Sequence, residues 1–216
     1  MDDLAMRRNM IENQLRPSNV ADPRVLVAMG EVPRPPFLPA HLKAVAYSDD
    51  DLVMPDGRFL IEPLVIGRML QVAETKDTDT ALVVGCDTGY VGCVLAKLAG
   101  TVFSLVDPAH LAEVEARIDS LEAINLFAVP TAAGLEGHAE RAPYDVILVI
   151  GYVPEVPAPL LAQLAEGGRL VAVVGSGRIG RGTVVTRIHD HWGQVAAFDA
   201  AIPRFRGLKP KLQFQL

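Results

Sequence analysis

The stretch Ala81-Leu-Val-Val-Gly-Cys-Asp-Thr-Gly-Tyr90 decides the fold of this chain. Residues 82–84 form a short, continuous apolar run, which is typical of a strand buried on both faces. Residues 85–89 form a glycine-bounded turn, and apolar residues then recur at helical spacing until Gly100, where a helix would stop. Strand, glycine turn and helix together predict the first crossover of a nucleotide-binding α/β unit, with helix N–H groups facing any ligand above the turn.

Composition limits the class of protein. A chain of 216 residues, 50% apolar and 21% charged, predicts one domain with a full hydrophobic core and argues against global disorder. The formal charge of −6 argues against general nucleic-acid binding. Cys86 and Cys93 are the only cysteines, which suits a reducing compartment and not a disulfide framework. The acidic N-terminus and the lack of a long apolar run predict a cytoplasmic protein without a membrane partner.

Residues 1–79 predict a helical segment packed on the core. Helices are expected at 4–15, from Pro23, at 41–45 and at 64–73, with an extended proline-rich connector at 32–39 and a loop at 53–63.

Residues 80–216 predict the main domain. Buried strands are expected at 82–84, 102–106, 126–129, 145–150 and 170–174. Helices separate the strands, and the helix before the strand at 170–174 is expected to include Leu164 and to end at Gly167. Residues 183–189 and 194–201 predict an antiparallel pair. The expected fold class is therefore α/β: a doubly wound, mostly parallel, Rossmann-like sheet with N-terminal helices and an antiparallel C-terminal edge.

Other patterns favour ordinary structure over chemistry. The His189-Asp190-His191 run lacks an identifiable third ligand, so a solvated turn is favoured over a metal site. The glycine-rich run 175–182 lies between two strands, which favours a hairpin loop over a phosphate site. A dinucleotide dehydrogenase shares the first crossover, but the turn lacks the third glycine of that motif. The tail carries four basic residues, expected to be solvated or to touch an anionic group: Arg204, Arg206, Lys209 and Lys211.

Several collinear stretches match one known family. They include Met10-Ile-Glu-Asn-Gln-Leu15, Asp22-Pro-Arg-Val-Leu26, Val32-Pro-Arg34, Ala142-Pro-Tyr-Asp145 and Gly167-Gly-Arg-Leu-Val171. From Met10 to about residue 203 the chain resembles the protein-L-isoaspartate O-methyltransferases. The resemblance implies a class I methyltransferase fold, S-adenosylmethionine as cofactor, and proteins or peptides with isoaspartyl residues as substrates. It implies transfer of a methyl group to the isoaspartyl carboxylate, which is itself the nucleophile, so no catalytic base and no metal are expected.

The resemblance also implies a set of cofactor-binding residues. The family's Gly-Thr-Gly-Ser-Gly turn reads here Gly85-Cys86-Asp87-Thr88-Gly89, with an aspartate at the middle glycine. Asp87 is expected either to lie beside the cofactor or to cap the next helix and fill the anion site itself. The ribose-binding acid aligns with Val106, and Asp107, one residue later, either replaces it or only starts a helix. The family's Gly-Asp-Gly near the adenine aligns with 132–134, which makes Ala133 the candidate there.

The candidate substrate-binding residues are Phe59, Ile61 and Glu62. The family's Gln-Thr-Ile-Ser-Gln-Pro reads here Arg58-Phe-Leu-Ile-Glu-Pro63, so the two hydroxyl side chains that line the isoaspartyl site become apolar and Glu62 repels a carboxylate. Two hypotheses follow. The chain is a methyltransferase of this family, weakly active or with an altered substrate, or it is a non-catalytic paralogue that uses the scaffold to bind a protein or another small ligand.

Overall fold

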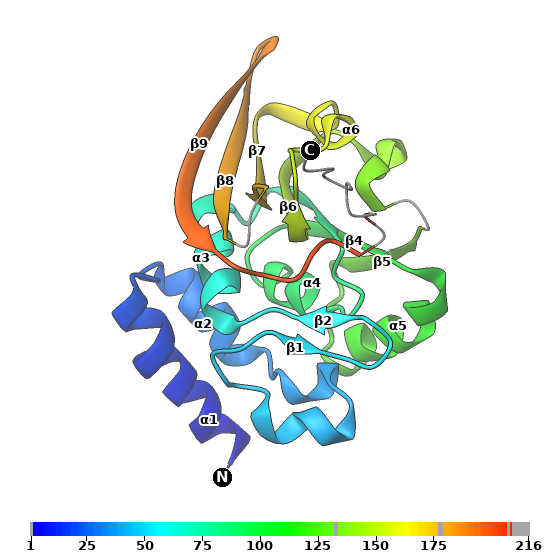
Figure 1. Ribbon diagram of the computed structural model, residues 1–216. Helices are drawn as coiled ribbons and strands as arrows, with labels where there is room; N and C mark the ends of the chain where they lie inside the picture. Colours follow the sequence, from blue (N-terminus) through cyan, green and yellow to red (C-terminus); the bar gives the residue numbers. More distant parts are fainter. Residues whose placement is uncertain (1, 132–133, 177–178, 207, 209–216) are drawn as a thin grey trace, which may run out of the picture.

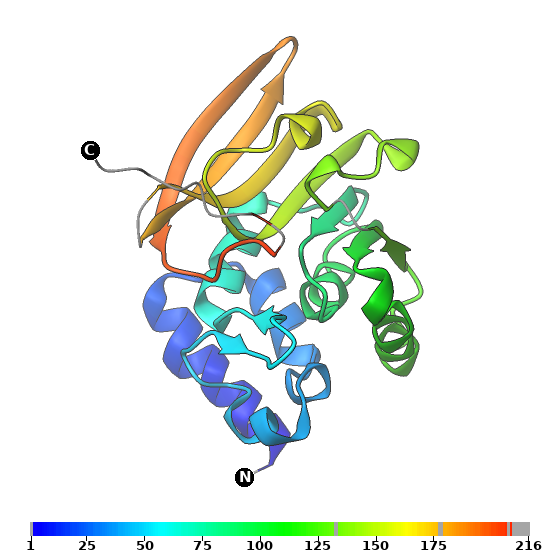
Figure 2. The same ribbon diagram turned by 45° about the vertical axis from the view of Figure 1, so that its right-hand side comes forward.

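A seven-stranded sheet forms the centre of the protein. The computed structural model describes residues 2–131, 134–176, 179–206 and 208 (Figure 1). The strand order is β5-β4-β3-β6-β7-β8-β9. The first five in chain order pair in parallel: β3 (Thr80–Val84), β4 (Thr101–Val106), β5 (Leu126–Pro130), β6 (Tyr144–Val153) and β7 (Leu164–Val174). An antiparallel hairpin of β8 (Gly180–Ile188) and β9 (His191–Ala200) extends one edge (Figure 2), so the expected fold class is confirmed.

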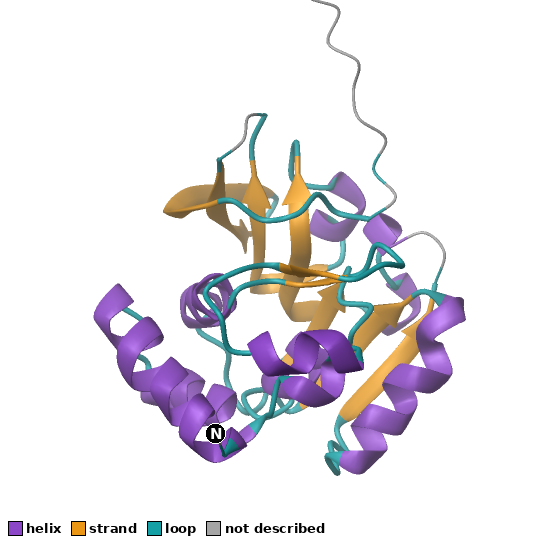
Figure 3. Ribbon diagram, turned by 60° about the horizontal axis from the view of Figure 1, so that its bottom comes forward, coloured by secondary structure: helices purple, strands orange, loops and turns teal. Residues whose placement is uncertain are grey.

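Helices surround this sheet (Figure 3). The α-helices are α1 (Asp3–Met10), α2 (Pro23–Glu31), α3 (Pro63–Ala73), α4 (Tyr90–Leu95), α5 (Leu111–Ser120) and α6 (Ala158–Leu161). Tighter turns lie at Arg16–Ser18, Pro35–Phe37, Ala40–Val45, Pro108–His110, Gly134–Glu136 and Ala139–Arg141, and α1 continues into a π-helical turn at Ile11–Leu15. In the described part of the chain, no helix is both long enough and apolar enough to cross a bilayer.

Alternation along the parallel strands divides the core into two layers. In β3, Ala81 and Val83 face the layer formed by the N-terminal helices with α3, α4 and α5, whereas Leu82 and Val84 face a smaller layer against α6. All four side chains are fully buried, as the continuous apolar run predicts.

Two expected elements were wrong in detail. Leu164 belongs to β7 and not to the preceding helix, because it pairs with Tyr144 at the start of β6 and the helix ends at Leu161. A shift in register after this pair accommodates Gly168 and also Gly167, where the helix was expected to end. The loop expected at 53–63 contains a small hairpin, β1 (Leu52–Val53) with β2 (Phe59–Leu60).

Strand β6 also runs further than expected, and this matters for the site. The sequence predicts a strand over 145–150, but pairing with β7 resumes at Tyr152 after an irregularity. Gly151 lies inside that irregularity with φ of +125°, a conformation that a side chain would strain.

Candidate active site

A cavity of about 270 Å³ opens at the carboxyl ends of β3 and β4. Strand β3 pairs with β4 on one side and with β6 on the other, so the cavity lies at the switch point where open α/β sheets bind their ligands. The lining includes the expected Gly85, Asp87 and Asp107, together with Gly134 and two residues of the C-terminal segment, Phe205 and Arg206.

Asp87 points along the cavity wall and does not cap α4. Its Oδ1 accepts a hydrogen bond from the backbone N–H of Asp107 at 2.9 Å. The residue before α4 is Gly89, which has no side chain to cap the helix, and the N–H of Tyr90 donates to Thr88 Oγ1 at 3.4 Å. The capping alternative for Asp87 was therefore wrong, because its carboxylate is engaged across the cavity with the end of β4.

Asp107 starts a helical turn, as one of its two alternatives predicts, and it also lines the cavity. Its Oδ1 accepts from the N–H of Ala109 at 2.9 Å and so starts the turn Pro108–His110. The same carboxylate lines the cavity and is 40% exposed, which leaves acceptor capacity for a ligand hydroxyl. Its use in cofactor binding stays a prediction.

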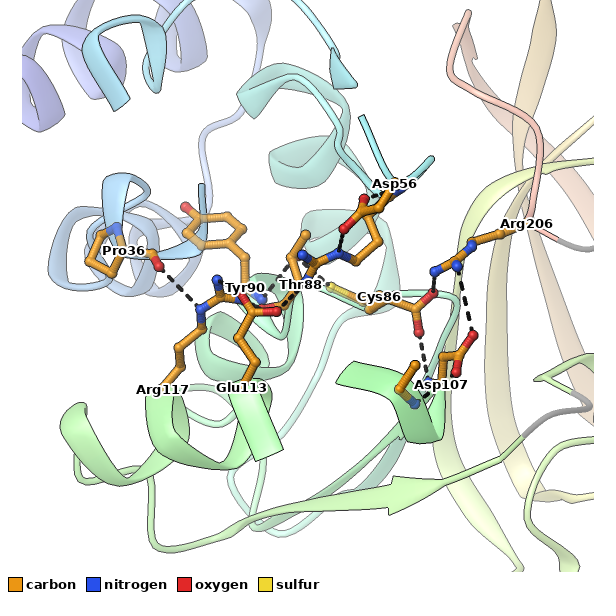
Figure 4. Close-up of polar contacts among 12 residues, drawn as sticks. Pro36, Asp56, Cys86, Thr88, Tyr90, Asp107, Glu113, Arg117 and Arg206 are labelled. Atoms are coloured by element: carbon orange, nitrogen blue, oxygen red, sulfur yellow. Dashed lines mark hydrogen bonds and ion pairs between the residues drawn. The ribbon is translucent and has the colours of Figure 1, made fainter. Parts of the chain in front are cut away.

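The basic tail contributes a cation to the cavity. Arg206 Nη1 lies 3.1 Å from Asp87 Oδ2, and its Nη2 lies 3.7 Å from Asp107 Oδ2 (Figure 4). Of the two alternatives for the tail, contact with an anionic group is the one realised at Arg206, and the anions belong to this chain. Arg204 is exposed, with its guanidinium 5.9 Å from the Tyr152 ring, whereas Lys209 and Lys211 lie outside the described residues.

Of the other expected cofactor residues, Cys86 and Gly89 are not among the residues that line the cavity, and Ala133 lies outside the described residues. Cys86 is buried, and burial raises the pKa of its thiol, so the neutral form is favoured. Gly89 packs against α5, where an added Cβ would lie 3.0 Å from Val114. Ala133 lies outside the described residues, but the neighbouring Gly134 lines the cavity. In the described ranges no three His, Cys, Asp or Glu side chains gather as metal ligands.

Phe59, Ile61 and Glu62 follow one another at the end of the β1–β2 hairpin. The side chains of Phe59 and Ile61 are buried in the larger core layer, whereas Glu62 is half-buried at the start of α3. The Glu62 N–H donates to Asp51 Oδ1 at 2.9 Å, so the acidic loop 49–51 folds against this span. Its role in substrate binding stays a prediction.

Arg34 holds the same span from inside, and sequence reasoning missed it. It is fully buried, with Nε donating to the carbonyl of Ala46 and Nη2 to the carbonyl of Ile61 at 3.0 Å. Its guanidinium lies 5.1 Å from the centroid of the Tyr90 ring, at the first residue of α4. Burial lowers the pKa of Arg34 from its ordinary value. The only available signal was the arginine in the Val32-Pro-Arg stretch, and a sequence pattern does not show which backbone carbonyls that arginine contacts.

A second arginine connects the glycine turn to the N-terminal segment. Arg117 of α5 donates from Nη1 to the carbonyl of Thr88 at 3.0 Å and from Nε to the carbonyl of Pro36 at 3.1 Å (Figure 4). Arg58 of the hairpin pairs with Glu113 on the same helix at 2.6 Å. These contacts fix the glycine turn, α5 and the β1–β2 hairpin relative to one another.

Glu62 provides a pH-dependent prediction. Burial, and then the charges of Asp51, Asp49 and Asp50, raise the pKa of Glu62 above its ordinary 4.5. Because the folded state binds the proton more tightly, ionised Glu62 costs stability as the pH rises through 4.5 and above. We expect Glu62→Gln to stabilise the protein near pH 7 by about 0.5 kcal/mol, with the gain vanishing below about pH 4. Urea unfolding near pH 7 and below about pH 4 measures the difference in the free energy of unfolding between the variant and the unmodified protein. The exposed Glu115→Gln serves as control, and an unchanged or lower stability at pH 7 contradicts the argument.

The mostly parallel sheet, the glycine turn after its central strand and the cavity at the switch point define a Rossmann-like α/β fold, and its overall likeness to solved structures makes it a class I methyltransferase fold. A family model described as protein-L-isoaspartate(D-aspartate) O-methyltransferase matches residues 5–196. The chain belongs to the protein-L-isoaspartate O-methyltransferase family, which transfers methyl groups from S-adenosylmethionine to the isoaspartyl carboxyls of damaged proteins.

Named relatives and solved structures agree with this assignment. A protein-L-isoaspartate O-methyltransferase of Koribacter versatilis is 42% identical over 171 residues, 79% of this chain and 77% of that protein. One of Marinobacter nauticus is 36% identical over 194 residues, 89% of each chain. A Plasmodium falciparum structure, described as a putative family member in complex with S-adenosyl-L-homocysteine, covers 95% of this chain and 99% of that chain with a TM-score of 0.75; at 17% identity it supports the fold alone.

Proposed function

We propose that this chain binds S-adenosylmethionine in the cavity at the ends of β3 and β4 and methylates isoaspartyl carboxylates of damaged proteins. The observation that carries the proposal is the position of this cavity at the switch point, in a chain whose family match spans 5–196. When bound, the cofactor supplies an electrophilic methyl group on a sulfonium.

The residues around the cavity fit such a ligand. Gly85 and Gly134 let the backbone approach closely, since neither has a side chain to fill the cavity. The exposed carboxylate of Asp107 has the chemistry to accept bonds from ribose hydroxyls. Asp87 puts a negative charge where the carboxylate end of the cofactor is expected, and in this structure that charge pairs with Arg206 at 3.1 Å.

On the acceptor side, apolar residues exclude water, whereas the carboxylate of Glu62 opposes a second carboxylate. We assign this side to Phe59, Ile61 and Glu62, in the N-terminal part of the chain, 1–79. Arg34 fixes the backbone there through the Ile61 carbonyl. Because the acceptor carboxylate is already a nucleophile, holding it in line with the methyl group is sufficient and no base is required.

Methyl transfer to a peptide tests the proposal. Label from methyl-labelled S-adenosylmethionine is expected on an isoaspartyl peptide and not on the same peptide with ordinary aspartate. Asp107→Ala is expected to lower kcat/KM for the cofactor at least about tenfold by removing hydroxyl acceptors, whereas Asp119→Ala, an exposed aspartate on α5, serves as the matched control. Labelling of neither peptide overturns the proposal and favours a non-catalytic binding role.

A further inference from the structure

The C-terminal segment crosses the carboxyl ends of the strands after β9. In Figures 1 and 2 this segment, at the red end of the chain, runs from β9 back over the sheet. It is held by an isolated parallel β-bridge between Arg204 and Tyr152, in which the Tyr152 N–H donates to the Pro203 carbonyl at 2.8 Å and the Phe205 N–H donates to the Tyr152 carbonyl at 2.9 Å. The segment is therefore fixed to β6 at the point where that strand was longer than expected.

Phe205 fills the space that three glycines leave open. Its side chain belongs to the smaller core layer and the residue is only 7% exposed. A Cβ added at Gly85 would lie 2.5 Å from Phe205 Cε2, one at Gly134 would lie 3.0 Å from its Cζ, and one at Gly151 would lie 2.7 Å from its Cα. Because Gly85 follows β3 and Gly151 lies in β6, the ring forms part of the cavity wall at the switch point, where the fold places a ligand.

Arg206, the next residue, brings a positive charge to the same cavity. Its guanidinium bridges Asp87, whose side chain is 14% exposed, and Asp107. An aromatic ring followed by a cation repeats the two features that S-adenosylmethionine presents, its adenine and its positively charged sulfonium and ammonium groups. The bridge also engages the carboxylate of Asp107 that a ribose would need.

We propose that Phe205 and Arg206 are an internal competitor for the cofactor cavity and are displaced when the cofactor binds. The proposal rests on the proposed function and adds a regulatory step to it. If only a fraction of the molecules can bind the ligand at any time, the apparent Kd equals the intrinsic Kd divided by that fraction. If the segment closes the cavity 90–99% of the time, the apparent Kd rises about 10- to 100-fold.

Titration with S-adenosylhomocysteine tests this proposal. We compare the unmodified chain with Phe205→Ala/Arg206→Ala, with Arg206→Ala alone, and with Arg204→Ala as the matched control, an exposed arginine of the same segment. The double variant is expected to bind at least about tenfold more tightly, Arg206→Ala severalfold, and Arg204→Ala within about twofold. If removing Phe205 prevents folding, seen by thermal unfolding, Arg206→Ala decides, because its side chain is 34% exposed and lies outside the core.

The outcomes separate this inference from the proposed function. Equal or weaker binding by the variants, with measurable binding by the unmodified chain, overturns the competitor and leaves the proposed function standing. Absence of binding by every protein at millimolar ligand overturns the proposed function and the competitor with it.

A fluorescent reporter provides an independent readout of displacement. Trp192 is the only tryptophan, so Phe205→Trp in a Trp192→Phe background reports on the segment alone. Ligand is expected to shift the emission to the red as the indole leaves the cavity for water. Binding with unchanged emission contradicts displacement.

Discussion

Replacing Arg34 by alanine is expected to lower the free energy of unfolding by about 3 kcal/mol. The side chain is fully buried, and its loss leaves the carbonyls of Ala46 and Ile61 without those donors, at about 1–3 kcal/mol for each buried group. The void that the shorter side chain leaves in the core adds to this loss of stability, whereas removal of a desolvated charge offsets part of the loss. Urea unfolding followed by circular dichroism measures the difference.

Two further variants identify the cause of this loss. Arg34→Met keeps most of the volume, so it is expected to restore the packing part of the loss and not the hydrogen bonds. Arg16→Ala removes an exposed arginine that pairs with Glu12 one helical turn away, and is expected to change stability by less than about 0.5 kcal/mol. A loss below about 1 kcal/mol for Arg34→Ala would show that the buried guanidinium does not hold the Ile61 span.

Gly85→Ala is expected to destabilise the protein by about 3 kcal/mol and to disturb the cavity. Gly85 has φ of +86°, which costs an L-residue about 1–2 kcal/mol. The new Cβ would also lie 2.5 Å from the carbonyl oxygen of Ile150, which is backbone of β6 and cannot rotate away. Overpacking of this kind costs about 1–3 kcal/mol. Thermal and urea unfolding measure the total.

Gly57→Ala is the matched control for this substitution. Gly57 has φ of +81°, but an added Cβ would meet nothing within 4 Å. The difference between the two variants therefore isolates the steric contact at the switch point, expected at about 2 kcal/mol. Equal losses would mean that Gly85 is required only for its backbone conformation and that β6 does not press on the turn.

The central unit was predictable because its signals are local. A buried apolar run, two glycines with positive φ and helical spacing describe one crossover, and the carboxyl ends of β3 and β4 bring Asp87 and Asp107 together whatever the rest of the chain does. The missed features depend on distant partners. Leu164 has the spacing of a helix, but its pairing with Tyr144 places it in a strand. Local propensity is overridden where the sheet supplies a partner.

The site was predictable only in part, for the same physical reason. Arg206 and Asp87 are 119 positions apart in the sequence, and Arg34 and Ile61 are 27 apart. Helical and strand periodicities relate only residues that are close in sequence, so they predict neither contact. The basic tail was compatible with a solvated terminus or with contact to an anionic group, and the sequence did not indicate which anion. Phe205 gave no signal, because an aromatic residue after the last strand looks like ordinary core until the three glycines around it are seen together.

Mapping S-adenosylhomocysteine onto the protein by ¹H–¹⁵N NMR tests the central claim most directly, because it detects weak as well as tight binding and locates the site. The account predicts shifts of the amides of Gly85, Asp87, Asp107 and Gly134, with Phe205 and Arg206 moving as the segment leaves the cavity. Unchanged spectra at millimolar ligand, or shifts confined to residues away from the ends of β3 and β4, would contradict it.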